Sequence, residues 1–276
     1  MGRSGTARGR CGGRRPGGRH RHRCVRPPAL SGADGAVVGT RRRTGGGLTM
    51  SMLHRPERFA SPMAWATDFM RKERFGLLVS QLEGELQFSH LPVLVDVEDD
   101  RVVRLRGHFA RSNAHWQALQ RDARATFVFN GPHAYMSAQW YSPGCQAAPS
   151  WNFVTVHLAG RVRLLDTPQQ TTDIVDELIA VNEAELPEQW SLAGYSTERR
   201  ARLTPHILGF ALDVDEVQPK FKLLQHYPDE DKIGAIAGLR SRGTDATRAI
   251  AHLMEQTLGQ GSHAMDVAKR LGPKDD

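Results

Sequence analysis

The stretch that decides the fold runs Arg104-Leu105-Arg106-Gly107-His108-Phe109-Ala110-Arg111-Ser112-Asn113-Ala114-His115-Trp116. Its β-forming residues predict the end of a strand, and Gly107 marks a kink or a close approach of another backbone segment. Ser112 or Asn113 can cap the short helix that follows. Arg111 would then lie beside backbone N–H groups at the positive end of that helix, an arrangement that holds a phosphate. A capped helix with a nearby Arg is also an ordinary surface feature. The other parts of the chain are therefore needed to choose between a phosphate site and this alternative.

Around this stretch lie segments rich in β-branched and aromatic residues and bounded by turn residues. Tight turns join most of them and only one short helix interrupts the series, which favours antiparallel pairing over βαβ winding. Six or more such strands fit a small barrel, because closure leaves no exposed edge. The predicted fold class is α+β, a mainly antiparallel barrel with flanking helices. The predicted strands cover residues 75–80, 85–97, 101–109, 125–129, 133–137, 150–165 and 206–214, and the predicted helices 61–74, 113–121, 174–181, 196–203, 231–239 and 244–258.

Three features predict irregularities in these strands. Pro92 cannot donate to a strand ladder and should mark a bulge or an edge. Asn130-Gly131-Pro132 should break the strand that precedes it. Gly160 should bend the longest strand or form a bulge in it.

The positive net charge of +7 comes from the first 49 residues, which hold twelve Arg, thirteen Gly and a single acid, Asp34, and so carry +11. The remainder carries −4, since 7 − 11 = −4, so no basic face is expected on the body. Such a segment cannot bury enough apolar surface to fold, and we expect disorder. We favour a translation start at Met50 or Met52; an Arg-rich nucleic-acid arm is the second interpretation. A targeting peptide is disfavoured by the short apolar run Ala36-Val37-Val38.

Several classes of protein are disfavoured by missing motifs. No Walker loop, Gly-x-Gly-x-x-Gly or Gly-x-Ser-x-Gly is present, which argues against NTPase, Rossmann and hydrolase functions. Histidines are scattered singly without metal-ligand spacing, so no metal site is expected. Cys145 is the one cysteine of the body, which suits a reducing cytoplasm. No apolar run reaches the roughly 18 residues of a membrane span.

Aromatic and amide side chains gather near the strand breaks, where Trp151-Asn152-Phe153 follows Tyr135 and Trp140-Tyr141. Flat apolar groups and amide donors are what a flavin ring needs for stacking and for hydrogen bonds to its pyrimidine edge. In the alternative interpretation, Trp151 and Phe153 are core residues and Asn152 lies on the other face. Periodicity alone favours that alternative.

Four blocks in the same order and at similar spacing resemble those of one family. They are Ser89-His90-Leu91-Pro92, Arg106-Gly107-His108-Phe109-Ala110-Arg111-Ser112-Asn113 with Trp116, Gly131-Pro132-His133-Ala134-Tyr135-Met136-Ser137 with Trp140-Tyr141, and Pro149-Ser150-Trp151-Asn152-Phe153 with Val156-His157. On these blocks the chain resembles the FMN-binding negative transcriptional regulators, the PaiB-like proteins, over about residues 52–240. The resemblance implies the split β-barrel of pyridoxamine-phosphate oxidase and small flavin reductases, and usually an FMN-binding homodimer. The domains would be a split barrel over 50–228 and helices over 229–276 with a frayed end.

The same resemblance implies which residues meet the cofactor. Arg111, Ser112 and Asn113 would bind the FMN phosphate, and the segment of Ser89 and His90 would lie against the isoalloxazine. The other cofactor-binding candidates on these blocks are Arg106, His108, Trp151, Asn152 and His157. The sequence Lys220-Phe221-Lys222-Leu223 resembles a further block of the family, but Leu224 and His226 replace the expected Ser and Asn, so the role of that block stays open.

Two functions of different class follow from these observations. The family name implies an FMN-binding transcriptional repressor, although no helix-turn-helix is evident and the acidic body disfavours direct DNA contact. The alternative is an FMN-dependent oxidoreductase, in which the flavin carries the hydride and the protein orients it. A haem-binding split barrel is a third and more distant interpretation, with a histidine as axial ligand.

Overall fold

The structure, a computed structural model, describes residues 53–59, 61–165, 167–190, 194 and 196–259. The sequence-based predictions for residues 1–49 and for the end of the chain beyond Gly259 lie outside these ranges.

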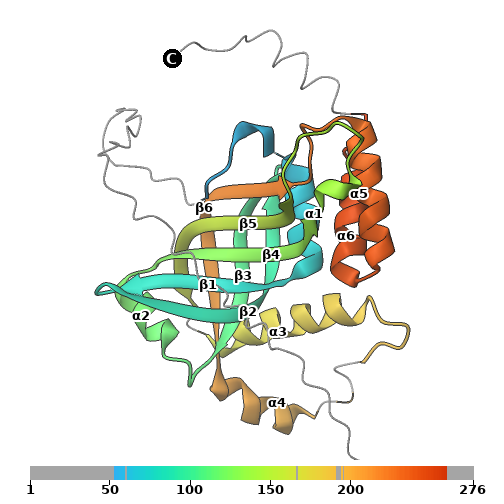
Figure 1. Cartoon of the computed structure of the whole chain (residues 1–276). Helices are drawn as coiled ribbons and strands as arrows, with labels where there is room; N and C mark the ends of the chain where they lie inside the picture. Colours follow the sequence, from blue (N-terminus) through green and yellow to red (C-terminus); the bar gives the residue numbers. More distant parts are fainter. Residues whose placement is uncertain (1–52, 60, 166, 191–193, 195, 260–276) are drawn as a thin grey trace, which may run out of the picture. The chain divides into compact units, whose positions relative to one another are not determined.

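Six antiparallel strands close into a barrel in the order β1-β2-β3-β6-β5-β4 (Figure 1). Tight turns join the first three strands, which is why they pair in sequence order. The predicted α+β class with an antiparallel split barrel is confirmed. The strands are β1 (Phe75–Leu82), β2 (Glu85–Glu98), β3 (Arg101–Ala110), β4 (Arg124–Met136), β5 (Ser150–Leu164) and β6 (Ile207–Lys222).

Of the three predicted strand irregularities, the structure shows one as predicted and differs at the other two. The predicted bulge at Gly160 is present, because the register of β5 against β6 shifts between Ala159 and Gly160. Asn130-Gly131-Pro132 does not break the strand as predicted: β4 continues through it, and a register shift between Asn130 and His133 absorbs the unpaired proline. Pro92 carries no bulge either. It lies where β2 stops pairing with β1 and begins to pair with β3, and the nearby register shift falls between Asp96 and Val97.

The barrel is filled by aromatic and aliphatic side chains from alternate strand positions, among them Phe109, Phe127 and Phe210, all fully buried. Gly107 is required by this packing, because a Cβ there would lie 2.7 Å from the carbonyl oxygen of Pro92 and 2.8 Å from the Phe210 ring. The predicted close approach at Gly107 is thus confirmed.

Helices cover the barrel on two sides (Figure 1). α3 packs on β2, β3 and β6, where its Ile174 and Leu178 contact Leu94. α5 and α6 pack side by side and against β4. The helices are α1 (Met63–Glu73), α2 (His115–Arg121), α3 (Pro168–Glu183), α4 (Thr197–Leu203), α5 (Asp229–Arg242) and α6 (Asp245–Glu255), with short 3-10 turns η1 (Glu57–Phe59), η2 (Ala138–Trp140) and η4 (Thr204–His206).

Candidate functional site

The turn between β3 and α2 is held firmly by its backbone. The Arg111 N–H donates to the carbonyl of His206 at 2.8 Å, and the Arg111 carbonyl accepts from the indole N–H of Trp116 at 3.0 Å. The Arg111 side chain is exposed, and within the described residues its guanidinium has no carboxylate partner. Ser112 beside it is also exposed. Arg111 is therefore a fixed, uncompensated positive charge.

A chain of hydrogen bonds ties this turn to the barrel interior. The Asn113 amide donates to Ser89 Oγ at 2.8 Å, and Ser89 Oγ lies 2.8 Å from His115 Nδ1. The other imidazole nitrogen, Nε2, lies 2.8 Å from Ser80 Oγ, so both ring nitrogens are engaged. Burial lowers the pKa of His115, which favours the neutral ring. The polar residues under the turn thus form a satisfied network that fixes its position.

The short helix α2 has fewer free backbone N–H donors for a phosphate than its sequence predicts. It has seven residues, and the N–H of His115 already donates to Asn113 Oδ1 at 3.0 Å. The N-cap position is Ala114, which makes no side-chain capping bond, so the predicted cap by Ser112 or Asn113 is wrong; Asn113 precedes the cap and binds only the first N–H of the helix. The side-chain amide and carbonyl of Asn113 are both occupied. The main anion-binding group of the turn is therefore the exposed guanidinium of Arg111.

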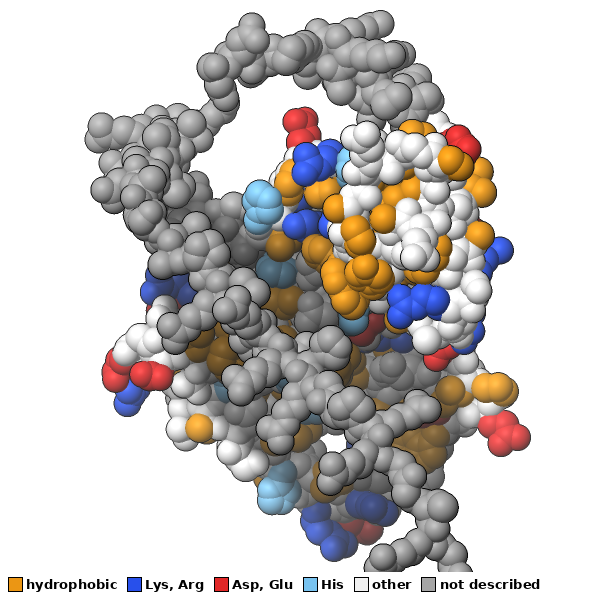
Figure 2. Space-filling model, viewed as in Figure 1, with side chains coloured by type: hydrophobic (Ala, Val, Ile, Leu, Met, Phe, Trp, Pro, Cys, Tyr) orange, Lys and Arg blue, Asp and Glu red, His pale blue; other side chains and the backbone are white. Residues whose placement is uncertain are grey.

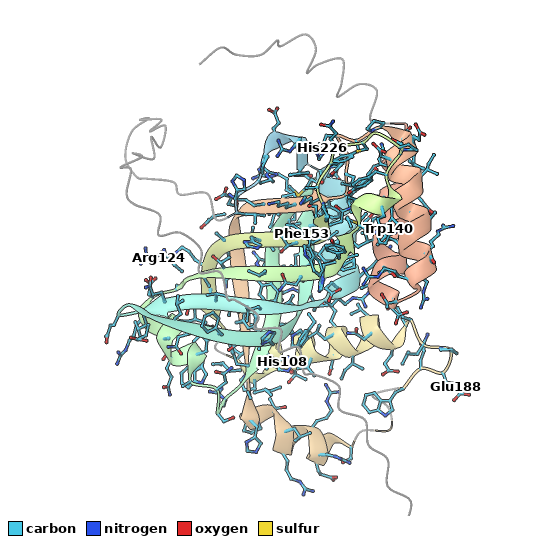
Figure 3. All side chains as sticks on the ribbon, in the orientation of Figure 1. His108, Arg124, Trp140, Phe153, Glu188 and His226 are labelled. Atoms are coloured by element: carbon cyan, nitrogen blue, oxygen red, sulfur yellow. The ribbon has the colours of Figure 1, made fainter. Side chains whose placement is uncertain are left out.

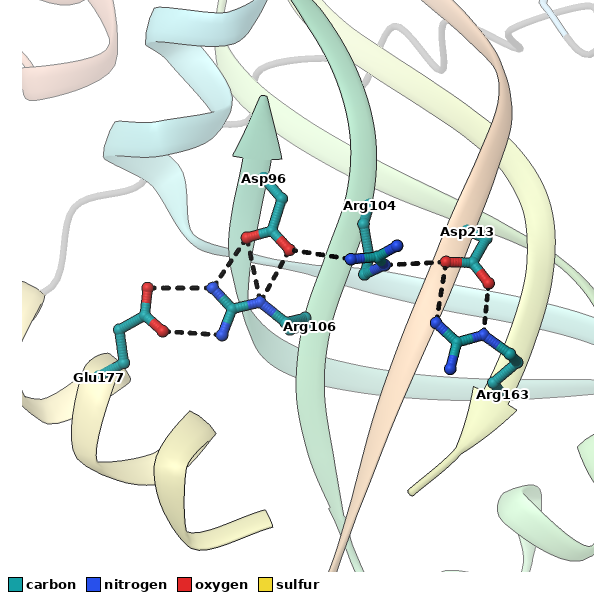
Figure 4. A network of polar contacts seen from close by, with 6 residues as sticks. All are labelled: Asp96, Arg104, Arg106, Arg163, Glu177 and Asp213. Atoms are coloured by element: carbon teal, nitrogen blue, oxygen red, sulfur yellow. Dashed lines mark hydrogen bonds and ion pairs between the residues drawn. The ribbon is translucent and has the colours of Figure 1, made fainter. Parts of the chain in front are cut away.

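Arg106 is engaged in an ion-pair network (Figure 4). Its guanidinium lies 2.8 Å from Asp96 and 2.7 Å from Glu177 of α3, and the two carboxylates raise its pKa. Along the same network, Asp213 pairs with Arg104 and Arg163 and has its pKa lowered to about 2, chiefly by the hydrogen bond from Arg163. These contacts anchor α3 on the barrel and occupy the donors of Arg106.

His108 lies between the barrel and helices α3 and α4, away from the aromatic candidates Phe153 and Trp140 (Figure 3). It lines a cleft of about 370 Å³ whose other walls include Ile179, Trp190 and Leu203. Its Nδ1 is buried without a hydrogen-bond partner among the described residues, and burial lowers its pKa. Arg111 lines an adjoining cleft of about 550 Å³ at the beginning of α3.

Two other candidates share one outer side of the barrel. One row of directly paired residues crosses β2, β1, β4 and β5. In that strand order, the row consists of His90, Leu77, Val128 and His157. Neighbouring strands are about 4.8 Å apart, so His90 and His157 lie roughly 14 Å from each other. We call this side of the sheet, marked by that row, the open face, because its side chains are exposed or half-buried.

Large apolar side chains lie exposed along the same outward positions. Phe75 is 50% exposed and stacks on His90 with ring centroids 6.2 Å apart. Phe88 is 58% exposed and Trp151 52%. Exposed apolar side chains gathered on one face of a sheet are typical of an interaction surface.

A groove of about 540 Å³ runs along β4 and β5 at one end of the open face. Trp151 lies at its edge and contacts the rings of His133 and Tyr135, at 5.7 and 6.0 Å between centroids. His157 also lines the groove, and burial and the nearby charge of Lys220 lower its pKa. The groove thus combines aromatic walls with two imidazoles, and the lowered pKa of His157 favours the neutral form of that ring.

Asn152 lies on the opposite side of β5 from Trp151. It is fully buried, and its amide contacts the sulfur of Met254 in α6 at 3.3 Å. Its Oδ1 has no partner among the described residues. Trp140 and Tyr141 likewise pack inward: Gly238 of α5 leaves room for the Trp140 indole, which a Cβ would meet at 2.3 Å.

The predicted residues therefore fall into separate groups on one copy of the chain. His90, Trp151 and His157 lie on the open face, and Arg111, Ser112 and Asn113 on the turn. The others, which are Ser89, Arg106, His108 and Asn152, lie inside the barrel or under helices. Sequence analysis did not single out the buried pair Ser80 and His115. A serine at an inward strand position was the signal, since a buried hydroxyl requires a partner.

The closed six-stranded antiparallel barrel is the fold expected of a split-barrel flavin-binding protein, and the match to a family model assigns the chain to that class. The chain belongs to the family described as "Putative FMN-binding domain", whose model matches residues 53–216, and its cofactor is FMN. No helix in the described part of the chain is long and apolar enough to cross a membrane.

Relatives share most of this region. The "Protease synthase and sporulation protein PAI 2" of Bacillus subtilis (strain 168) is 28% identical over 193 residues, which cover 69% of this chain and 90% of the relative. An uncharacterized protein of Emericella nidulans is 25% identical over 225 residues, 68% of this chain and 90% of the relative. Among solved structures, the FAD and haem binding protein from Mycobacterium smegmatis is 16% identical with a TM-score of 0.43, and the match covers 65% of this chain and 79% of that one. A likeness at this level says nothing about the ligand.

Proposed function

We propose that two copies of this chain hold FMN between them, with the phosphate on Arg111 and Ser112 and the ring against the segment of Ser89 and His90. The observation that carries the proposal is the Arg111 guanidinium, which is uncompensated and stands on a turn fixed by Asn113 and His115. A charge-assisted hydrogen bond to a phosphate oxygen needs such a preplaced donor. Arg106 does not qualify, because Asp96 and Glu177 occupy it.

The exposed side chains of the open face support the proposal of a homodimer. Its apolar side chains, Phe75 and Phe88 above all, are exposed in the single chain and would be covered in a homodimer. The candidates Trp151 and His157 lie away from the turn of their own copy, so a second copy can bring its open face over the flavin bound at the first. Light scattering at micromolar protein concentration tests this arrangement: a dimer mass is expected, and a monomer mass contradicts it.

The function that fits best is that of a regulatory flavoprotein of the PaiB-like kind. Its Bacillus subtilis relative carries a name that refers to sporulation, which supports a regulatory role. Direct contact with DNA has weak support, because the chain outside the first 49 residues carries a net charge of −4. A cytoplasmic location remains a prediction, supported by the free, partly buried thiol of Cys145.

The alternative is an FMN-dependent oxidoreductase, favoured by the groove along β4 and β5 beside the open face. Oxidation of NADH or NADPH by the FMN-loaded protein would support this alternative, and gel shifts at stated salt would support DNA binding. The absorbance spectrum of the purified protein comes first. Flavin bands are expected, and a Soret band without flavin bands would overturn the proposal in favour of haem.

A further inference from the structure

The end of β6 carries two lysines in a chain whose positive charge comes mostly from arginine. The sequence holds six Lys against 31 Arg, and Lys220 and Lys222 stand two residues apart. Alternate positions of a strand point to the same side, so both ammonium groups lie on one face of the barrel. Lysine presents a compact point charge, whereas arginine presents a planar fork, so these positions favour a different kind of contact from the ion pairs of the other strands.

A third cation joins them around a single aromatic ring. The ammonium groups of Lys220 and Lys222 each lie 6.0 Å from the centroid of the Phe59 ring, and Arg58 Cζ lies 5.1 Å from it. We call Arg58, Lys220 and Lys222 the cationic cluster. In the upper part of Figure 2, basic and histidine side chains lie beside hydrophobic ones, with one acidic side chain at the edge of the group.

Among the described residues, no carboxylate forms an ion pair with the cationic cluster. Lys220 Nζ donates to the carbonyl of His54 and Lys222 Nζ to Ser150 Oγ, both at 2.6 Å and both neutral acceptors. By contrast, the buried Lys232 pairs with the carboxylate of Asp229 at 2.6 Å.

Holding these charges together is unfavourable for the free protein. Burial lowers the pKa of Lys220, and burial together with the charges of Lys220 and Arg58 lowers the pKa of Lys222. The nearby His226, whose ring lies 5.6 Å from Phe59, has its pKa lowered by burial and by Arg58 and Lys222. A bound anion would relieve this repulsion.

The groove of β4 and β5 leads directly to the cationic cluster. His133 pairs across the strands with Phe153, and Phe153 pairs with Lys222. Thr155, which also lines the groove, pairs with Lys220. Lys220 Nζ lies 5.2 Å from the centroid of the Phe153 ring, so a ligand on the groove wall is within reach of the ammonium groups.

We propose that the cationic cluster binds the phosphate or carboxylate of a small aromatic molecule whose ring lies in the groove beside Phe153 and His133. This site is separate from the FMN phosphate site of the same copy, because Arg111 is fixed by His206 just before β6 begins and the lysines lie at its other end. The anion site stands on its own contacts. Its position next to the flavin of a second copy rests on the proposed function and would make the bound molecule the reaction partner or the signal of the flavin.

The test uses the full chain, with and without FMN, in a buffer free of phosphate and sulfate. Phenyl phosphate and benzoate serve as probes in calorimetric titrations, with inorganic phosphate for comparison. The double variant Lys220→Gln/Lys222→Gln should weaken phenyl phosphate at least tenfold, since it removes two charge-assisted contacts. Lys72→Gln removes an exposed charge from α1 and should change nothing. Arg111→Ala should leave phenyl phosphate binding intact while FMN binding falls.

A second measurement does not depend on the variants folding. In the unaltered protein, phenyl phosphate should protect Lys220 and Lys222, but not Lys72, from an amine-directed reagent, as read by peptide mass. Equal binding by all variants, or no protection, would overturn the proposal. If phenyl phosphate displaces FMN and the double variant loses FMN, the cluster belongs to the flavin site and the separate ligand is excluded. If inorganic phosphate binds as tightly as phenyl phosphate, the groove contributes nothing and the aromatic part of the proposal is wrong.

Discussion

Replacing Arg111 by Ala removes the one uncompensated guanidinium on the turn while leaving its backbone contacts in place. The N–H of residue 111 still donates to His206, and its carbonyl still accepts from Trp116. The turn should therefore keep its shape, because Asn113 and His115 hold it through groups that the substitution does not touch. The expected effect is confined to the ligand.

The magnitude follows from the contact that is lost. A hydrogen bond to a charged group is worth about 1.5–3 kcal/mol. At about 1.4 kcal/mol for each factor of ten, Arg111→Ala should weaken FMN binding about ten- to a hundredfold. Quenching of flavin fluorescence during titration measures this dissociation constant directly.

Riboflavin, which lacks the phosphate, separates recognition of the phosphate from general damage. Its affinity should be almost unchanged in Arg111→Ala, whereas a folding defect would weaken both ligands alike. Arg121→Ala is the matched control, since Arg121 is an exposed Arg on the adjoining helix whose contact is with Glu83. Equal loss for FMN and riboflavin, or no loss for either, would refute the assignment of the phosphate to this turn.

Further outcomes are expected elsewhere in the molecule. Phe88→Asp on the open face should convert a dimer into a monomer by light scattering, while Leu186→Asp, at a similarly exposed apolar residue after α3, should not; identical masses would contradict a dimer through this face. His115→Ala should lower the free energy of unfolding by about 2–4 kcal/mol in urea titrations, because the buried hydroxyl of Ser80 loses its imidazole partner and that of Ser89 keeps only the Asn113 amide; a change below about 0.5 kcal/mol would show that the network does not stabilise the fold. Histidines with lowered pKa stay neutral in the folded chain while their unfolded counterparts protonate near pH 6.5, so stability should be full above that pH and fall as the pH drops below it. The slope should be smaller in variants of the contributing residues, which are His108, His115, His157 and His226, and a flat profile between pH 7 and 5 would contradict the assignment.

The barrel could be predicted from the sequence because its signals are local. Alternation of apolar residues, tight turns and the glycines at 107 and 160 each report on a few neighbouring positions, and the structure confirms them. The break predicted at Asn130-Gly131-Pro132 was wrong for a physical reason: a bulge lets the strand continue past a residue that cannot donate.

The side of the sheet to which a residue points was harder to predict. Alternation on β5 correctly separates Trp151 from Asn152, but it does not say which of the two faces inward. Periodicity favoured Trp151 as the core residue, yet Trp151 is half exposed and Asn152 is fully buried. The deciding contact is with Met254 of α6, which lies 102 residues away, so no local pattern could reveal it.

The same limit applies to Arg106 and Arg111, which look alike in sequence as two basic residues five positions apart. One is neutralised by Asp96 across the β2–β3 hairpin and by Glu177, 71 residues further along the chain in α3. The other projects from the turn without a carboxylate in the described chain. Phosphate binding requires a cation that is not already paired, because a carboxylate in contact competes for the same donors. The position of α3, which no short motif encodes, thus decides which of the two arginines is available to the cofactor.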